Sequence, residues 1–371
     1  MSTNAIRVQV GPANYFSFLG AIDKLSEFYP PAALDHALWI YGERALAAAS
    51  DYLPAAFHGE NAVRAVFSTH CSESTVADLV QRAGSNRQVV IGIGGGAALD
   101  TAKVVARKLG VPLVAIPTIA ATCAAWTPLS VWYNDAGQAL NFEIFNDANH
   151  LVLVEPRIIL QAPVAYLLAG IGDTLAKWYE AVVLSPQPET LSLTVRLGLQ
   201  AALDIRNVLL KQSEAALQAV KQGELTQDFL DVVDAIIAGG GMVGGLGERY
   251  TRVAAAHAVH NGLTLLPQTE HFLHGTKVAY GILVQTALLE QDEALKSLIA
   301  AFNKLGLPTH LAALDVDIND REGIEHVIGR ILKPSESIHY LPIALNSDKL
   351  WAAIERVEMA AQRTHSAGIG V

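Results

Sequence analysis

Four of the twelve histidines of the chain lie in one short stretch, residues 257–275, with the sequence HAVHNGLTLLPQTEHFLHG. They are His257, His260, His271 and His274. Imidazole nitrogens bind divalent metals and also transfer protons near neutral pH. His257 and His260 are three residues apart and would share one face of a helix, but they do not form the HExxH pair of zinc proteases. The cluster therefore predicts a metal site or an acid–base relay that needs a further ligand from another segment.

A candidate for that ligand is Asp173, in the otherwise apolar segment GIGDTLAKWYE. A buried carboxylate is costly unless it is paired or bound to a metal. Gly170 and Gly172 would let a neighbouring element approach closely. Two other interpretations remain open: Asp173 interacts with the dipole of a helix that starts there, and the histidines are ordinary hydrogen-bonded core residues.

The segment VVIGIGGGAALDTAK, residues 89–103, has the pattern of a strand, a glycine turn and the start of a helix. Gly92, Gly94 and Ala97 satisfy the loose form of the dinucleotide-binding pattern. Glycines let the backbone approach a pyrophosphate, and the free N–H groups at a helix N-terminus bind its charge. The alternative is a tight strand-to-helix turn that only packs on a sheet.

The acidic residue that usually follows such a loop by about 20 positions, and binds the adenosine ribose, is absent here. The first acid after Asp100 is Asp135. Another segment must therefore bind the ribose, and we expect it to be the earlier strand end at residues 41–44, Tyr-Gly-Glu-Arg.

Short β-rich segments alternate with helical ones over roughly the first 160 residues, which predicts a parallel sheet with covering helices. The expected strands are residues 36–42, 62–68, 87–93, 111–117 and 151–156. Long, Ala- and Leu-rich amphipathic segments follow and predict helices. We expect an α/β dinucleotide-binding domain at residues 1–162 and an all-helical metal- and substrate-binding domain at residues 163–371.

The composition restricts the possible partners. A net charge of −10 and a pI near 5.6 argue against nucleic acid or an anionic membrane, since both need a basic face. Two cysteines are too few for a disulfide framework and fit a reducing compartment. The N-terminus lacks a signal-peptide pattern, and the longest charge-free apolar run, residues 235–247, is shorter than the roughly 20 residues of a membrane span. We therefore expect a soluble, cytoplasmic protein.

Four motifs occur in an order that resembles a known family. They are GIGGGAALDTAK, IPTIAATCAAWTPLSVWYNDAG, GIGDTLAKWYEA, and AAAHAVHNGLT followed by HGTKVAYG. Together they resemble the iron-containing (group III) alcohol dehydrogenase superfamily, on its glycerol dehydrogenase branch, and within that branch the relatives that reduce 2-oxo acids. The resemblance implies a dehydroquinate synthase-like architecture with an N-terminal dinucleotide-binding domain, a helical C-terminal domain and a bound metal.

The same resemblance assigns the metal ligands to Asp173, His257 and His274, and we expect His260 to act beside them as a proton-relay group. Iron-using members have a further histidine four residues after the acid, where this chain has Lys177, so we expect one zinc ion rather than iron. The resemblance also assigns two sets of residues to the pyrophosphate loop and to the nicotinamide half of the cofactor: Gly94, Gly95, Gly96, Ala97 and Asp100, and Thr118, Thr122, Thr127, Leu129 and Tyr133.

Three residues favour a carboxylate substrate over a polyol. Cys123 replaces the aspartate with which glycerol dehydrogenases contact polyol hydroxyls, and we expect it to line the pocket rather than act as a nucleophile. Lys177 lies one helical turn after Asp173, on the same face. Arg252 lies where glycerol dehydrogenases tend to have a small residue. Cations near a metal suit an anionic substrate, although either one could instead form a structural ion pair.

The strand end at Gly42 bears on the choice of nicotinamide. NAD-dependent members have an aspartate there that accepts a hydrogen bond from the ribose 2′-hydroxyl. This chain has Gly42, with Arg44 two residues later. An acid would repel a 2′-phosphate, whereas glycine and a nearby arginine tolerate one, so we expect NADP(H) to be preferred over NAD(H). The alternative is that Arg44 is only a solvated residue on a helix surface.

The expected activity is the metal-dependent reduction of small 2-oxo acids to 2-hydroxycarboxylates by hydride transfer from NAD(P)H, in a homo-oligomer. One alternative is a polyol dehydrogenase with glycerol-like substrates. A second is a lyase of the 3-dehydroquinate synthase type, which keeps its nicotinamide bound and usually has Glu as its first ligand. A third, a non-catalytic metal- or nucleotide-binding protein, would require one of the motifs to be broken, and none is.

Overall fold

The computed structural model describes residues 5–368, and the chain divides into two compact units. The first, which we call the sheet unit, consists of Gln9–Val164 and Ala219–Gly245. The remaining described residues form the second, which we call the helical unit. The sequence analysis assigned residues 219–245 to the helical domain, whereas here they group with the sheet unit, for a reason that the packing of those residues explains below.

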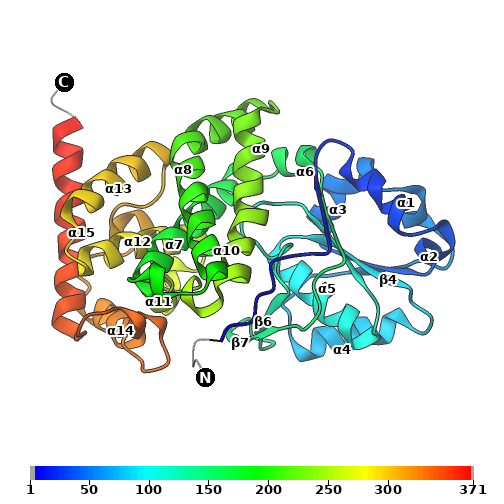
Figure 1. Ribbon diagram of the computed structural model, residues 1–371, viewed down its shortest axis with the longest axis horizontal. Coiled ribbons are helices and arrows are strands. Elements are labelled where there is room, and N and C mark those ends of the chain that lie inside the picture. Colours follow the sequence, from blue (N-terminus) through cyan, green and yellow to red (C-terminus); the bar gives the residue numbers. More distant parts are fainter. Residues whose placement is uncertain (1–4, 369–371) are drawn as a thin grey trace. The chain divides into compact units, whose positions relative to one another are not determined.

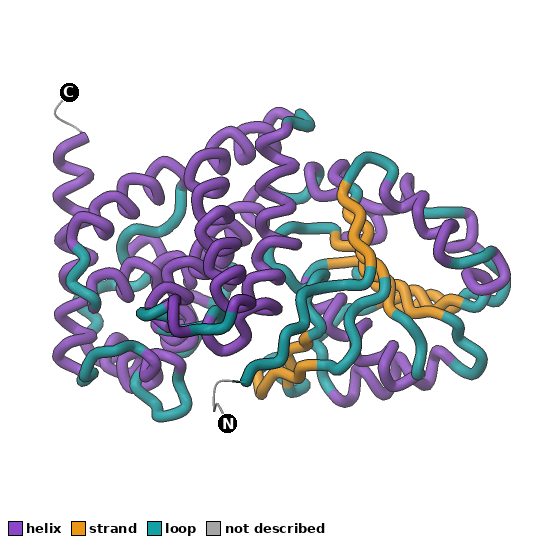
Figure 2. The backbone as a smooth tube through the Cα atoms, in the orientation of Figure 1, coloured by secondary structure: helices purple, strands orange, loops and turns teal. Residues whose placement is uncertain are grey.

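The sheet unit contains six parallel strands in the order β1-β8-β5-β4-β2-β3, shown in orange in Figure 2. Five of them coincide with the predicted strands; β1 was not predicted, because its sequence NYFS contains no β-branched residue. The strands are β1 (Asn14–Ser17), β2 (Ala37–Tyr41), β3 (Val63–Val66), β4 (Val89–Gly94), β5 (Leu113–Pro117) and β8 (Leu151–Val154).

Alternate residues of the central strands enter cores on opposite faces of the sheet, as the period of two requires. In β2, Trp39 and Tyr41 pack with residues of α1 and α3, whereas Leu38 and Ile40 pack with residues of α4 and α5. Burying each such side chain stabilises the fold by roughly 1.5–3 kcal/mol. The helices named here and their neighbours (Figure 1) are α1 (Leu25–Phe28), α2 (Pro31–Asp35), α3 (Glu43–Ala49), α4 (Glu73–Ala83), α5 (Gly96–Leu109) and α6 (Pro156–Leu160).

The strand order reverses between β2 and β4. From β2 the chain runs to the edge strand β3 and then crosses back to β4, on the other side of β2. Ligands of open α/β sheets bind outside the carboxyl ends of the strands at such a reversal. Here those ends are Gly42, after β2, and Gly95, after β4. The two ends lie side by side, because a β-carbon on Gly94 would lie 4.0 Å from Cβ of Ala45 in α3.

The glycine-rich helical segment, residues 227–245, groups with the sheet unit because its backbone packs directly on Trp126 and on residues near the N-terminus. A β-carbon on Gly241 would lie 2.3 Å from the ring of Trp126. The amide of Gln9 donates to the carbonyl of Gly245 at 2.9 Å, and the Tyr15 hydroxyl donates to Asp234 at 2.7 Å. The elements of this segment are α9 (Gln227–Asp234), a π-helical turn (Ala235–Gly239) and α10 (Gly240–Gly247).

These elements join into one helical run, Gln227–Tyr250, which is longer than the apolar stretch considered from the sequence. By length and composition alone the run could cross a membrane, with a mean hydropathy of 1.6 over its most apolar window. Half of that window is buried within the protein, as in the core helix of a globular fold.

The helical unit contains no strand among the described residues. Its helices are amphipathic or fully buried: α12 has 13 buried residues in its 15, which makes it the centre of the unit. The helices are α7 (Val164–Leu184), most of α8 (Leu193–Gln222), α11 (Ala255–Leu263), α12 (His274–Leu288), α13 (Asp292–Leu305), α14 (Arg321–Ile331) and α15 (Ser347–Gly368).

Candidate active site

The three predicted metal ligands lie together in the helical unit. Asp173 is in α7, His257 is in the first turn of α11, and His274 is the first residue of α12. The Oδ1 atom of Asp173 lies 3.3 Å from Nε2 of His257 and 3.2 Å from Nε2 of His274. One donor atom from each residue lies within 4.8 Å of the other two, which is a separation that one divalent cation can bridge.

Two glycines make this convergence possible. A β-carbon on Gly172 would lie 2.5 Å from the carbonyl oxygen of Gly275, and one on Gly275 would lie 1.8 Å from the carbonyl oxygen of Ala169. Helices α7 and α12 therefore touch through their backbones. Because Asp173 and His274 each adjoin one of these glycines, the contact brings their side chains together.

The donor atoms fit a cation. Asp173 is 6% exposed, and its Oδ1 atom is buried without a hydrogen-bond partner. The Nδ1 atom of His257 lies 2.7 Å from the carboxylate of Glu180, which only accepts hydrogen bonds when ionised, so Nδ1 holds the proton and Nε2 presents a lone pair in the neutral ring. Lone pairs that face each other at about 3 Å repel unless a proton or a metal lies between them.

The electrostatics of the cluster point the same way. Burial alone would raise the pKa of Asp173, but the imidazoles of His274 and His257 hold it well below its usual value. Burial would lower the pKa of His257, and the carboxylates of Glu180 and Asp173 outweigh this and raise it to about 9. The site therefore attracts positive charge, as a metal site must.

His260 adjoins the cluster without facing Asp173. Its Nε2 atom lies 3.0 Å from Nδ1 of His274. Burial, together with the neighbouring imidazoles of His274 and His257, holds the pKa of His260 well below its usual value. His271, by contrast, lies with 63% of its side chain exposed, 3.3 Å from Asp315.

The two predicted substrate cations of the helical unit are both half-buried. Lys177 lies one turn after Asp173 in α7, and its charge contributes to the lowered pKa of that carboxylate. Arg252 lies in the segment between the short helix Glu248–Tyr250 and α11. Lys177 therefore acts electrostatically on the candidate metal ligands.

The glycine loop of the sheet unit forms the turn between β4 and α5. A β-carbon on Gly95 would lie 2.7 Å from Cδ1 of Ile119, and one on Gly96 would lie 3.4 Å from Oγ1 of Thr122. Gly95 is the N-cap of α5 and makes no side-chain hydrogen bond to the free N–H groups of the first turn, which includes Ala97. A 14-residue helix whose N-terminus is bare in this way suits a phosphate group.

Asp100 has its side chain engaged inside the protein rather than at the loop surface. It pairs with Lys103 at 2.8 Å and accepts a hydrogen bond from the amide of Val131 at 3.0 Å. Burial raises its pKa, against the opposing charge of Lys103. Lys103 in turn donates to the carbonyls of Ala124 (2.9 Å), Thr127 (3.1 Å) and Leu129. The pair thus ties α5 to the loop predicted to line the nicotinamide.

Lys103 was not selected from the sequence. Its signal was present: an acid and a lysine three residues apart in an otherwise apolar helix predict a buried ion pair, but not which loop it holds. That loop leads into β6 (Leu129–Tyr133), which pairs with β7 (Ala139–Ile144) in an antiparallel ribbon.

The remaining predicted cofactor residues occupy this loop and the ends of its strands. Thr118 is buried and its amide donates to the carbonyl of Gly94, so β5 and the glycine loop are joined directly. Thr122 accepts from the amide of Ala124 at 3.3 Å. Tyr133 stacks on His70, with ring centroids 5.7 Å apart. Cys123 is half-buried, and its backbone carbonyl accepts hydrogen bonds from the amides of Trp126 and Thr127, which shapes the turn.

Gly42 and Arg44 begin α3, beside the glycine loop at the reversal of strand order. Gly42 has φ near −80°, which any residue can adopt, and a β-carbon there would meet nothing closer than 3.9 Å. The glycine is therefore not required by the backbone. Arg44 is exposed.

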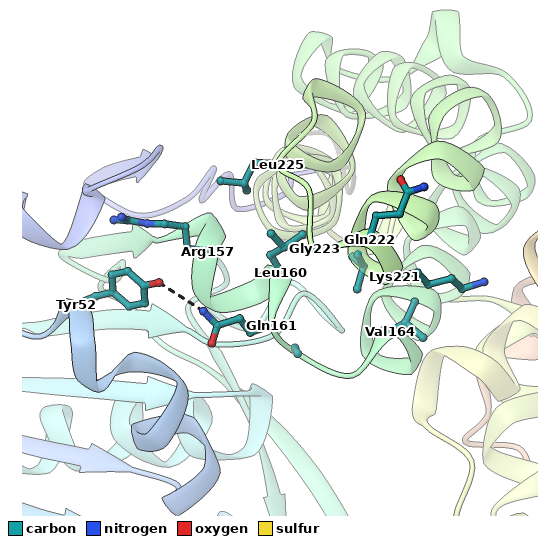
Figure 3. A pocket seen from close by; sticks show the side chains of 11 residues that line it. Tyr52, Arg157, Leu160, Gln161, Val164, Lys221, Gln222, Gly223 and Leu225 are labelled. Atoms are coloured by element: carbon teal, nitrogen blue, oxygen red, sulfur yellow. Dashed lines mark hydrogen bonds between the residues drawn. The ribbon is translucent and has the colours of Figure 1, made fainter.

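The hollow in Figure 3, of about 850 Å³, lies elsewhere in the sheet unit and contains none of the predicted metal or cofactor residues. Its Arg157 pairs with the buried Glu155 at 2.7 Å and lies over the ring of Tyr52, so its charge is already neutralised. Gln161 donates to the Tyr52 hydroxyl at 3.5 Å. We therefore place the chemistry at the cluster of Asp173 and not in this hollow.

Glu180 was also missed in the sequence. It lies seven residues after Asp173, two turns along the same face of α7, and its side chain is fully buried. An acid in that position of an apolar helix could have been recognised as a partner of the metal site.

The chain is similar to known proteins over most of its length. The family model for iron-containing alcohol dehydrogenase matches residues 12–156. Hydroxycarboxylate dehydrogenase A of Escherichia coli (strain K12) is 66% identical over 358 residues, with 96% of this chain and 99% of that protein covered. A glycerol dehydrogenase of Pseudomonas putida is 34% identical over 351 residues, with 92% and 94% covered. The solved glycerol dehydrogenase of Schizosaccharomyces pombe has a TM-score of 0.85 at 27% identity, with 99% and 94% covered.

Proposed function

Because the chain belongs to the iron-containing alcohol dehydrogenase family, on its glycerol dehydrogenase branch, we propose that it is a metal-dependent NAD(P)H oxidoreductase that reduces small 2-oxo acids to 2-hydroxycarboxylates. The main support is the convergence of Asp173 Oδ1 with the Nε2 atoms of His257 and His274. Further support for the substrate class comes from the 66% identity to a protein named hydroxycarboxylate dehydrogenase A.

Asp173, His257 and His274 would hold one divalent cation, with zinc favoured over iron because the position four residues after Asp173 is Lys177 and not a histidine. When bound, the cation supplies Lewis-acid polarisation of the substrate carbonyl and the reduced nicotinamide supplies the hydride. The buried carboxylate of Asp173 would offset part of the charge of the cation, and the neutral imidazoles would help to fix its position.

The chain's own contribution to substrate selection is positive charge. Lys177, and secondly Arg252, would bind the carboxylate of a 2-oxo acid through charge-assisted hydrogen bonds. Cys123 in place of an aspartate removes a like charge that would repel this carboxylate. His260, which is hydrogen-bonded to His274, would move a proton away from the metal ligands.

For the cofactor, the bare N-terminus of α5 would bind the pyrophosphate, and the loop held by Lys103 would contact the nicotinamide. Gly42 and the exposed Arg44 leave room and charge for a 2′-phosphate, which supports NADP(H) over NAD(H). The homo-oligomeric assembly and the cytoplasmic location expected from the sequence stay predictions.

A glycerol or polyol dehydrogenase is the second candidate. Several relatives named glycerol dehydrogenase are 32–34% identical to this chain over most of its length. Cys123 weighs against this candidate, because it replaces the aspartate with which glycerol dehydrogenases contact polyol hydroxyls. A polyol also has no negative charge for Lys177 to bind.

A substrate panel separates the two candidates. The purified, zinc-loaded protein is assayed with 2-oxobutanoate and 2-oxoglutarate in reduction and with glycerol in oxidation, each with both nicotinamides. We expect the highest kcat/KM for a 2-oxo acid with NADPH. Lys177→Met should raise KM for 2-oxobutanoate at least about tenfold and leave KM for an uncharged ketone unchanged. Glycerol oxidation that exceeds 2-oxo acid reduction would overturn the proposal.

A further inference from the structure

Two buried carboxylates that are not candidate metal ligands end the hydrogen-bond chains leading away from the imidazoles. Glu180, in α7, contacts His257 directly. Glu336, 7% exposed, is reached from His274 only through two intervening side chains. The other ring nitrogen of each imidazole faces Asp173. These hydrogen bonds therefore determine which ring nitrogen of each imidazole faces the candidate metal position with a proton and which with a lone pair.

In the direct hydrogen bond between Glu180 and His257, the imidazole is the donor. One oxygen of Glu180 accepts the backbone amides of Ala254 (2.7 Å) and His257 (3.0 Å) at the start of α11. These two bonds, made to the positive end of a helix, hold the carboxylate in place. Its second oxygen then accepts from Nδ1 of His257 at 2.7 Å, so that Nδ1 must be protonated.

In the longer hydrogen-bond chain, from Glu336 to His274, the donor and acceptor of each bond are set by Glu336 at the end away from His274. The amide nitrogen of Asn261 donates to Glu336 at 2.9 Å, so the amide oxygen of Asn261 faces Nδ1 of His260 at 3.0 Å. Glu336 is itself held by an ion pair with Arg330. An amide oxygen only accepts, so the proton of His260 is on Nδ1 and its Nε2 is an acceptor in the neutral ring.

The last link follows from the same reasoning. Because Nε2 of His260 accepts, Nδ1 of His274 at 3.0 Å must donate. The neutral ring of His274 then has its lone pair on Nε2, which lies 3.2 Å from Asp173. Both imidazoles thus reach the same tautomer by different routes, one through a charged partner and one through neutral partners.

We propose that Glu180 and the chain Glu336–Asn261–His260 are positioning groups that keep the proton of the neutral His257 and His274 rings on Nδ1, so that Nε2 of each ring is the atom that binds a metal. The inference rests on the metal site of the proposed function, but not on its substrate. Outer partners of metal-bound histidines typically change metal affinity by about 10–100-fold.

The two routes predict different variants. Glu180→Gln keeps the size of the side chain and removes the charge next to His257, and its zinc affinity should fall about 10–100-fold. Asn261→Leu removes the oxygen that orients His260 at similar volume, and its affinity should fall about tenfold. The double variant Asn261→Asp/Glu336→Gln restores an acceptor for His260 and a donor at the far end, so its affinity should return to within about threefold of the parent.

Glu358→Gln is the matched control. Glu358 is another partly buried carboxylate of the helical unit, which accepts from the Tyr280 hydroxyl at 3.2 Å and the amide of Leu311 at 2.8 Å. Among the described residues, Glu358 has no hydrogen bond to any member of the two hydrogen-bond chains that end at Glu180 and Glu336. Its substitution should leave zinc affinity unchanged, so a general effect of losing a buried acid is separated from the positioning role.

The measurements are zinc dissociation constants from competition with a chromophoric chelator at fixed pH, and ¹⁵N spectra of labelled histidine side chains in the metal-free protein. The parent should show His274 in the Nδ1–H form, and Asn261→Leu should show a mixture of both tautomers. Folded Glu180→Gln and Asn261→Leu proteins that bind zinc within twofold of the parent would overturn the inference. So would an Nε2–H tautomer of His274 in the parent. Neither readout uses turnover, so a parent that binds zinc normally but fails to reduce 2-oxo acids would refute the proposed function alone.

Discussion

Gly275 of α12 contacts Ala169 of α7 so closely that a β-carbon on Gly275 would lie 1.8 Å from the Ala169 carbonyl oxygen. The same β-carbon would lie 3.0 Å from Cβ of Asp173. The approach of these two backbones is therefore a condition for the candidate metal cluster, since it sets the distance between Asp173 and His274.

Gly275→Ala should separate α7 from α12 and weaken the metal site. A backbone carbonyl cannot move aside as a side chain can, so we expect a loss of about 3 kcal/mol in the free energy of unfolding and at least a hundredfold loss of zinc affinity. Urea denaturation and chelator competition measure the two effects. Gly329→Ala in α14 is the control: its β-carbon meets nothing within 4 Å, so the protein should be equally stable or more stable by up to about 1 kcal/mol.

Asp173→Asn should lose zinc and activity while still binding NADPH. The amide keeps the shape of the side chain but removes the charge that offsets the cation. We expect at least a thousandfold lower kcat with 2-oxobutanoate, and an NADPH dissociation constant within about threefold of the parent by fluorescence titration. Chelator treatment of the parent should reproduce the loss, and zinc should reverse it in the parent only. Full turnover in the metal-stripped variant would contradict a metal-dependent reaction.

Zinc binding should strengthen as the pH rises from 7 to about 9. Burial lowers the pKa of His257, but Glu180 and Asp173 raise it to about 9 in the metal-free protein, so below that pH an incoming cation displaces a proton. The zinc dissociation constant should fall by up to about tenfold per pH unit and level off above pH 9. A dissociation constant that is independent of pH between 7 and 9 would contradict the charged state of His257.

The same shift gives the metal-free protein a stability profile of definite sign. The folded-state pKa of His257 lies above its ordinary value of 6.5, so the stabilisation is fully present below about pH 6.5 and is lost as the pH rises through about 9. Thermal unfolding of the metal-free protein should therefore occur at lower temperature at pH 9 than at pH 6.5. Glu180→Gln removes the main cause of the raised pKa and should flatten this dependence.

Lys103→Met should loosen the loop that is predicted to line the nicotinamide. The substitution leaves Asp100 as a buried, unpaired charge and three carbonyls without a donor, at a cost of about 3–5 kcal/mol in unfolding free energy. KM for NADPH should rise in any protein that remains folded. Asp100→Asn/Lys103→Met should recover part of the stability, whereas Lys108→Met, at an exposed position of α5, should change neither quantity.

Gly42→Asp should shift the preference from NADPH toward NADH. The position has room for a side chain, and the carboxylate would repel a 2′-phosphate and accept from a ribose hydroxyl. We expect the ratio of kcat/KM for NADPH over NADH to fall about tenfold or more. Gly42→Asn has the same shape without the charge, so an equal shift in both variants would show that the effect is steric.

The sequence by itself determined five of the six parallel strands and the residue types of the candidate metal site. The strand segments were recognisable because buried parallel strands form short β-branched runs, and the motifs around Gly95, Asp173 and His274 are local in the chain. The grouping of residues 219–245 with the sheet unit could not be predicted from the sequence, for the opposite reason. Nothing local to that glycine-rich helix shows that its bare backbone packs against Trp126.

Only the tertiary structure decided which groups surround the ligands. Glu336 is 62 residues from His274 in the chain, and its effect passes through Asn261 and His260, whose order depends on which atom of each side chain faces the next. Lys103 likewise binds carbonyls of a loop more than 20 residues away. Ligand types follow from composition and spacing, but hydrogen-bond direction depends on atoms brought together by folding, and a linear sequence does not specify those distances.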